Sequence, residues 1–149
     1  MMKTLKTAMT TSISEVLETM FYLPVEIGEE STLIQSGMDM DLPNLACQLN
    51  FIGDFSGNFT LVIPKNLLEE ITEDFMGESR ESLEEEHLLG TLTEILNMIC
   101  GNALKKIKSN IPFDLDIPKV IDECKILENQ VFAIVETPQS KMAVSLVLA

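Results

Sequence analysis

The sequence is poor in the residues on which metal sites, disulfide frameworks and nucleic-acid interfaces depend. It has no tryptophan, one tyrosine, one histidine (His87) and three cysteines (Cys47, Cys100 and Cys124). The cysteines lie far apart without a CxxC pair, and an odd number within apolar patterns predicts reduced core thiols in a cytosolic protein. With one histidine and no Cys/His cluster, we expect no zinc or other metal site in the chain itself.

Long apolar runs and basic residues are also scarce. No stretch approaches the 18 or so apolar residues of a membrane helix, and the N-terminal segment MMKTLKTAMTTSIS lacks the apolar core of a secretory signal. We therefore expect a cytoplasmic protein. Ten Lys and Arg against 24 Asp and Glu give a net charge of −14, which disfavours nucleic acid and membranes as partners.

The sequence does contain enough apolar residues for a packed core. Its 149 residues are 46% hydrophobic, which argues against disorder and fits a single domain spanning residues 1–149. Apolar residues recur at three- and four-residue steps over residues 5–21, which predicts an amphipathic helix ended by Pro24 and Gly28. Ser12 and Glu15 match a capping box, which leaves the start of this helix open.

A hairpin and a short helix are expected next. The segments CQLNFI (47–52) and NFTLVI (58–63) alternate apolar and polar residues around the turn GDFSG, and Pro64 stops the second strand. Before them, a short strand is expected at residues 32–35. The helix that follows is capped by Asn66 with Glu69 and closed by Gly77.

A long helix is predicted over residues 83–108, with a capping box formed by Ser82 and Glu85. The segments VIDECKIL (120–127), VFAIVE (131–136) and MAVSLVLA (142–149) then predict three strands, with turns at 128–130 and 137–140. The element order indicates an α+β fold, with helices packed on a largely antiparallel sheet.

The long helix has two distinct faces. At about 100° per residue, an apolar stripe forms the core face, and its members are Leu88, Leu92, Ile95, Leu96, Ile99 and Ala103. Glu94 and Asn97 project together from the opposite side, because a spacing of three residues makes them neighbours. Gly90 and Gly101 flank the pair, although glycine within a helix costs about 1 kcal/mol relative to alanine. We interpret the two glycines as low spots at which a partner could dock.

The segment TEILNMICGNA (93–103) resembles the active-site helix of the CheX chemotaxis phosphatases, which remove phosphate from response regulators. The residues that match the family pattern are Glu94, Asn97, Met98, Gly101, Asn102 and Ala103. The first helix, ending in VLETM, and Pro118 resemble the family as well. The sequence departs from the family at Gly90, where Asp or Ser is frequent, and at Thr93, where Gly is usual.

The resemblance implies a CheC/CheX-like fold, a homodimer formed through the sheets, and an aspartyl-phosphate phosphatase that acts on a CheY-like response regulator. The partner would supply the phospho-aspartate, a bound Mg²⁺ and a lysine, so the chain would need no cofactor of its own. Asn97 would position the attacking water, since an amide is neutral and offers both a donor and an acceptor. Glu94 would pair with the partner's lysine.

Two other classes of function remain open. The chain could be a non-catalytic module that binds a receiver domain or a flagellar-switch component, or a dimeric structural domain with an acidic surface.

A faint internal repeat also bears on function, because SEVLETM (14–20) is similar to TEILNM (93–98) and suggests a duplicated helix-plus-strands unit. The alignment places Glu18 opposite Asn97, so we expect one working site, on the long helix.

Overall fold

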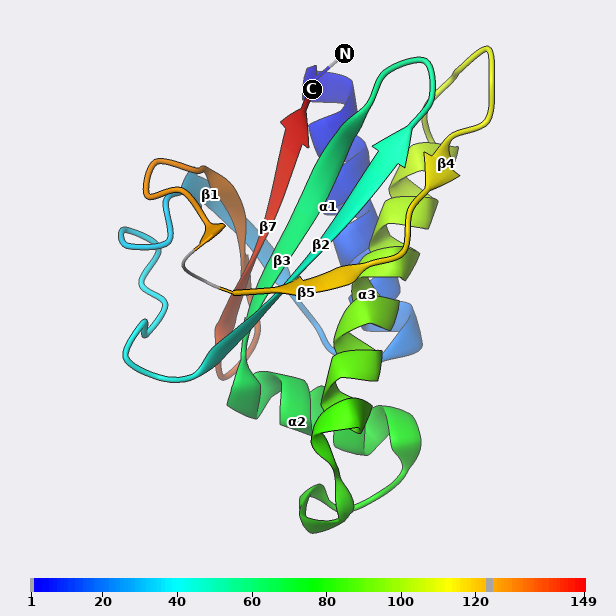
Figure 1. The fold of residues 1–149 in the computed structure, drawn as a ribbon. Helices are drawn as coiled ribbons and strands as arrows, with labels where there is room; N and C mark the ends of the chain where they lie inside the picture. Colours follow the sequence, from blue (N-terminus) through cyan, green and yellow to red (C-terminus); the bar gives the residue numbers. More distant parts are fainter. Residues whose placement is uncertain (1, 123–124) are drawn as a thin grey trace.

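The computed structural model describes residues 2–122 and 125–149. Within them, two long helices lie side by side on one face of a seven-stranded antiparallel sheet, and a third helix closes one end (Figure 1). The elements in order are α1 (Met2–Met20), β1 (Glu26–Ser31), β2 (Asn44–Ile52), β3 (Gly57–Pro64), α2 (Lys65–Met76), the 3₁₀ turn η1 (Arg80–Ser82), α3 (Glu85–Lys105), β4 (Asp114–Leu115), β5 (Lys119–Ile121), β6 (Phe132–Glu136) and β7 (Lys141–Leu148). This is the α+β fold that the sequence predicts.

The sheet is built from two similar halves that exchange a strand. Its order is β1-β6-β7-β3-β2-β4, with β5 also paired to β2. The first half contributes α1, β1 and the β2–β3 hairpin, and the second contributes α3, β5 and the β6–β7 hairpin. Strands β3 and β7 are neighbours at the centre, while β1 pairs with β6 and β5 pairs with β2. This arrangement is the one expected from a duplicated helix-plus-strands unit.

The main core lies between the helices and the sheet. The β2–β3 hairpin follows the predicted register, with Cys47 opposite Leu61 and Leu49 opposite Phe59, and these side chains are fully buried. The apolar stripe predicted on α3 is likewise buried against the sheet and α1. Complete burial of a leucine or isoleucine side chain stabilises the fold by about 1.5–3 kcal/mol, so this stripe fixes which face of α3 points outward.

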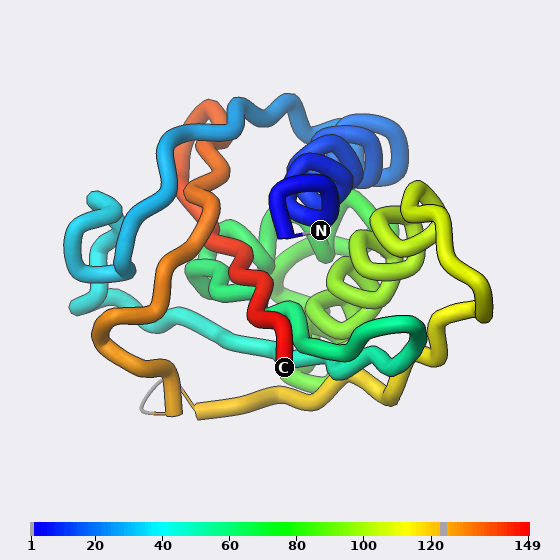
Figure 2. Tube along the Cα trace, turned by 90° about the horizontal axis from the view of Figure 1, so that it is seen from above, coloured from blue at the N-terminus to red at the C-terminus, as the bar shows by residue number. Residues whose placement is uncertain are grey.

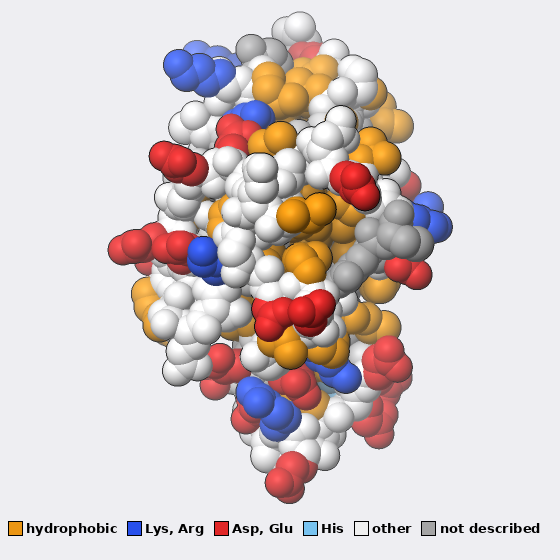
Figure 3. All heavy atoms as spheres, turned by 90° about the vertical axis from the view of Figure 1, so that its left-hand side faces the viewer, with side chains coloured by type: hydrophobic (Ala, Val, Ile, Leu, Met, Phe, Trp, Pro, Cys, Tyr) orange, Lys and Arg blue, Asp and Glu red, His pale blue; other side chains and the backbone are white. Residues whose placement is uncertain are grey.

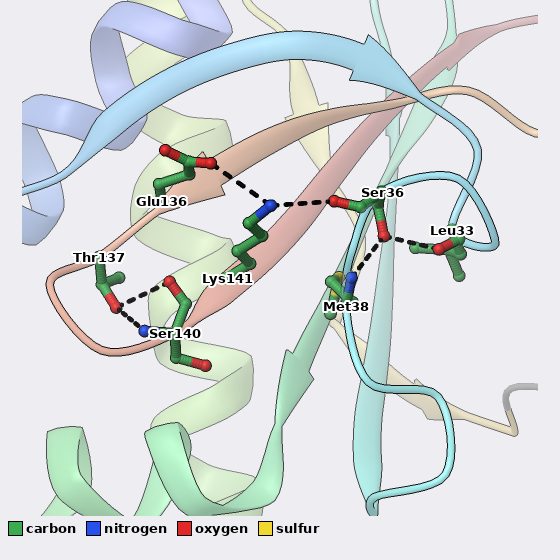
Figure 4. Close-up of polar contacts among 7 residues, drawn as sticks. All are labelled: Leu33, Ser36, Met38, Glu136, Thr137, Ser140 and Lys141. Carbon is green, nitrogen blue, oxygen red and sulfur yellow. Dashed lines mark hydrogen bonds and ion pairs between the residues drawn. The ribbon is translucent and has the colours of Figure 1, made fainter.

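The other side of the sheet is covered by the loop over residues 32–43, as Figure 2 shows from above. Lys141 holds this loop, because its Nζ donates to the backbone oxygen of Ser36 at 3.2 Å and pairs with Glu136 at 3.4 Å (Figure 4). The Ser36 hydroxyl donates to the oxygen of Leu33 and accepts from the N–H of Met38. These bonds seat Met38 in a second hydrophobic cluster with Val62 and Ala143.

Two local predictions are wrong at the N-terminal side, and one strand there was not predicted. Helix α1 begins at Met2, so Ser12 is buried within the helix rather than a cap, and its hydroxyl has no hydrogen-bond partner among the described residues. Residues 32–35 form turns, and the strand before them is β1 at Glu26–Ser31. The sequence of β1 is acidic and contains a glycine, so it does not show the apolar alternation that predicts a strand. This edge strand also has an irregularity in its pairing with β6 between Ile27 and Glu30.

The helix ends are partly as predicted. Gly77 closes α2 in the left-handed conformation, with φ 68°. The predicted cap of α2, Asn66, is two residues late, because the residue before the helix is Pro64, although Asn66 does accept the N–H of Leu67. Helix α3 begins at Glu85 rather than at residue 83. Its cap is Glu84, whose N–H donates to Nδ1 of His87 at 3.0 Å, and not Ser82.

The C-terminal strands β6 and β7 agree with prediction, and the turn between them is closed by the N–H of Thr137 donating to the oxygen of Ser140. The predicted strand at residues 120–127 is short, since β5 ends at Ile121. Cys124 lies outside the described residues, whereas Cys47 and Cys100 are buried and free. Burial raises the pKa of Cys47 to about 11 and raises that of Cys100 well above its ordinary value, so both stay protonated core thiols.

Candidate active site

Glu94 and Asn97 stand on the exposed face of α3, opposite the buried stripe. The two residues are three positions apart, which places them about 60° apart around the helix and about 4.5 Å apart along it. Ile95 and Leu96 between them are fully buried, so the helix cannot rotate to hide either polar side chain. The core of the protein thereby fixes where this pair points.

Neither side chain has a partner among the described residues. Glu94 and Asn97 form no side-chain hydrogen bond there, and Glu94 forms no ion pair, whereas other surface carboxylates such as Glu15, Glu73 and Glu136 do. An unpaired carboxylate beside an unpaired amide on a rigid helix is available to a group brought by another molecule. The arrangement is suited to recognition of a cation and to positioning of a water.

The two glycines predicted to flank the pair lie in open surroundings. A Cβ atom added at Gly90 would meet nothing within 4 Å, and one added at Gly101 would meet only Cδ1 of Leu115, at 3.9 Å. Packing within the chain therefore does not require glycine at either position. Thr93 uses its hydroxyl to bind the oxygen of Gly90, at 3.1 Å, so the two positions that depart from the family pattern are linked.

A groove of about 720 Å³ runs between α1 and α3 beside Asn97. Helix α3 contributes Asn97, Met98, Gly101, Asn102 and Lys105, and the opposite wall comes from the C-terminal half of α1. No sequence pattern predicts this groove, because it depends on how two helices far apart in the chain pack together. Helical geometry places Lys105 in line with Glu94, since 11 residues span three turns plus about 20°.

Glu15 of α1, which the repeat aligns with Glu94, is committed to a contact inside the chain. It accepts hydrogen bonds from Nδ2 of Asn102 at 2.8 Å and from Nζ of Lys106 at 3.1 Å. These two bonds, the Asn102 bond first, lower the pKa of Glu15 below its ordinary value of 4.5. The Glu15 carboxylate, which a second site on α1 would use, instead connects α1 to α3 through these two hydrogen bonds.

Other candidate sites have structural roles. Within residues 2–122 and 125–149, no group of three or more His, Cys, Asp or Glu side chains could hold a metal ion. His87 is half-buried and caps α3 through its ring nitrogen. In the part of the chain that the structure describes, no helix is both long and apolar enough to cross a membrane.

Several solved structures share this fold. Chemotaxis protein CheX from Vibrio vulnificus is 18% identical, with a TM-score of 0.77 over 97% of this chain and 99% of that one. CheX from Borrelia burgdorferi, solved as a CheX–CheY–BeF₃–Mg²⁺ complex, is also 18% identical, with a TM-score of 0.77 over 96% of each chain. FliY from Thermotoga maritima is 19% identical, with a TM-score of 0.59 over 95% of this chain and 84% of that one.

No curated protein sequence matches the chain. Residues 45–133, however, match the family model described as chemotaxis phosphatase CheX. The matched range is more than half of the chain and includes α3 with Glu94 and Asn97. By this match the chain belongs to the CheX family of chemotaxis phosphatases, as the sequence of its long helix predicts.

Proposed function

We propose that this protein is a phosphatase that hydrolyses the phospho-aspartate of a CheY-like response regulator. The observation that carries the proposal is the exposed, unpaired Glu94–Asn97 pair on the helix at the centre of the family match. Membership of a chemotaxis phosphatase family supports the reaction class, and the Borrelia burgdorferi relative solved together with CheY supports the partner.

Asn97 acts on the attacking water. Hydrolysis of a phosphoryl group requires the attacking and leaving oxygens to lie roughly in line, and positioning provides most of the catalysis. The Asn97 amide is neutral, so it approaches the phosphoryl oxygens without repulsion, and its oxygen and NH₂ group orient one water molecule. Its exposure on a helix fixed by the core allows this amide to enter a partner's pocket without rearrangement of the chain.

Glu94 directs the docking. A carboxylate is repelled by the phosphoryl group, but it forms a charge-assisted hydrogen bond with a lysine beside that group. Because no basic side chain of the described residues pairs with Glu94, this contact needs no internal ion pair to break. Gly90 and Gly101 leave the helix surface low on either side, so that the partner's backbone can approach.

Mg²⁺ is assigned to the partner. Bound by the response regulator, it would neutralise charge on the phosphoryl oxygens, and the chain would need no cofactor of its own. The residues of this chain then contribute the orientation of water, the contact with lysine and the shape of the docking surface.

The family resemblance also implies a cytoplasmic homodimer formed through the sheets. On the side of the molecule shown in Figure 3, apolar side chains gather between acidic ones. Loops on this side carry Ile34 and Leu127, which are 73% and 69% exposed. A second copy would cover such side chains, and this face lies away from α3, so a dimer leaves the site open.

The test is the release of phosphate from phosphorylated receiver domains of the same organism. Catalytic amounts of the protein should shorten the lifetime of the phospho-aspartate, and removal of Mg²⁺ from the mixture should abolish the effect. If a panel of cognate receivers keeps unchanged lifetimes but binds the protein, the chain is a binding module for receiver domains. If none binds, the proposal fails entirely.

A further inference from the structure

The groove between α1 and α3 combines an apolar interior with a direct connection to Asn97. Met20 at the end of α1 is 49% exposed, and Met98 and Leu115 line the groove from α3 and β4. Methionine side chains are flexible and adapt to an inserted apolar group. The absence of a side chain at Gly101 keeps the middle of the groove open, since Leu115 is the nearest group to its missing Cβ atom.

Two polar side chains that line the groove, Glu15 and Asn102, are bonded to each other. Glu15 accepts hydrogen bonds from Asn102 and Lys106, so this carboxylate and its two donors form a closed set. Lys105 differs from them, because it is exposed and forms no ion pair or side-chain hydrogen bond among the described residues.

Lys105 and Glu94 lie on the same face of α3 with Asn97 between them. Eleven residues separate the two charges, which is about 16 Å along the helix axis and about 20° around it. The exposed face therefore has a negative end, a neutral amide and a positive end. A partner with a basic and an acidic group at the same spacing pairs both groups with opposite charges on α3 when it docks in one direction. In the reverse direction, each of these groups meets a like charge.

We propose that the groove and Lys105 form a second docking contact for the receiver domain, which sets the direction in which it lies along α3. This inference rests on the proposed function. The receiver domain contributes an apolar side chain to the groove beside Met20 and Met98, and a carboxylate to Lys105, while its lysine pairs with Glu94. The contact is continuous with Asn97, because the same groove includes the amide.

The experiment measures kcat and KM for a phosphorylated cognate receiver domain with Lys105→Glu, and with Lys108→Glu as the matched control. Lys108 is also exposed and lies just beyond α3, outside the groove. We expect Lys105→Glu to raise KM at least fivefold at low salt with kcat within twofold of wild type. Lys108→Glu should change KM less than twofold, and high salt should reduce the difference, because exposed charges are screened.

A second variant tests the groove itself. Gly101→Leu places a side chain in the open part of the groove, and it should raise KM at least fivefold with little change in kcat. Thermal unfolding of each variant shows whether the fold is retained. An unchanged KM in folded Lys105→Glu and Gly101→Leu, with wild-type protein active, overturns the docking contact and the approach of the partner at Gly101, but leaves the phosphatase reaction proposed for Glu94 and Asn97 intact. An inactive wild type would instead remove the proposed function.

Sedimentation of the same variants distinguishes a second copy of the chain as the occupant. We expect Lys105→Glu to leave the oligomeric state unchanged. Loss of self-association in this variant with an unchanged KM would assign the groove to another copy of the chain and overturn the proposal.

Discussion

At position 97, an alanine would serve the helix better than asparagine does. Asparagine is a weak helix former, and the Asn97 side chain gains no hydrogen bond within the described residues to offset that cost. The same holds for the open positions Gly90 and Gly101. Local stability is given up along one exposed face, while the buried face keeps strong helix formers such as Leu92 and Leu96. Residues that break local preferences in this way mark functional positions.

Glu94→Lys should weaken association with the phosphorylated receiver domain about tenfold or more. The substitution places two cations together at the partner's lysine, and like charges that meet in an interface are repulsive. Titration of labelled receiver with wild type and variant measures the change, and Glu86→Lys, an exposed change in the first turn of α3, is the control. Equal binding by wild type and Glu94→Lys would refute the role of Glu94.

Gly90→Ala should affect stability and function in opposite directions. No atom lies within 4 Å of the added Cβ, so alanine should stabilise α3 by about 0.5–1 kcal/mol. The same methyl group would stand between α3 and a docked partner and lower kcat/KM. Chemical denaturation and phosphatase assays measure the two effects. Gly77→Ala is the control, because φ 68° at Gly77 makes that substitution destabilising. An unchanged kcat/KM in Gly90→Ala would exclude Gly90 from the docking surface.

At the scale of elements, α1 and α3 have similar sequences but different tasks. Glu15 is held by Asn102 and Lys106, and Glu18 occupies the position that the repeat aligns with Asn97. A carboxylate at that point would repel phosphoryl oxygens. The double variant Glu15→Ala/Glu18→Ala should therefore keep phosphatase activity within about threefold of wild type. A folded double variant as inactive as Asn97→Ala would show that α1 carries a site.

The bonds to Glu15 should also make the α1–α3 contact dependent on pH. The pKa of Glu15 is lowered in the folded protein, so its ionised form stabilises the fold above the unfolded pKa, and this contribution disappears as pH falls through the lower folded value. Glu15→Gln should thus lower the melting temperature at pH 7 by more than at pH 3. An equal difference at both pH values would mean that the charge of Glu15 does not stabilise the fold.

The sequence predicts the elements whose signals are local and misses those set by distant contacts. The stripe that includes Leu92 and Leu96 identifies α3, and alternation through Leu49 and Phe59 identifies the hairpin, because each has one buried face. Strand β1 has no such pattern and exists through its pairing with β6. Helical spacing places Glu94 and Asn97 on one face, and the resemblance of residues 93–103 to the CheX helix identifies them as a candidate site. The bonds of Glu15 and the groove beside Met98 require the packing of α1 on α3.

At the scale of the whole molecule, the proposed homodimer makes a separate prediction. Sedimentation equilibrium should give about twice the 16.6 kDa mass of one chain, because a second copy would cover the apolar side chains around Ile34 and Leu127. Leu127→Asp should shift the protein toward the monomer, whereas Glu94→Lys on the helical side should not. A monomeric wild type at high protein concentration would contradict the dimer.

The central claim is that Asn97 positions water for hydrolysis after the phosphorylated receiver domain has bound. The most direct measurement is phosphate release from a saturating phosphorylated receiver domain by wild type and Asn97→Ala, with binding of the same receiver measured in parallel. We expect Asn97→Ala to lose at least about 99% of the rate, a barrier increase of about 2.7 kcal/mol, while its affinity stays within about threefold of wild type. An Asn97→Ala variant that binds normally and hydrolyses at the wild-type rate would contradict it.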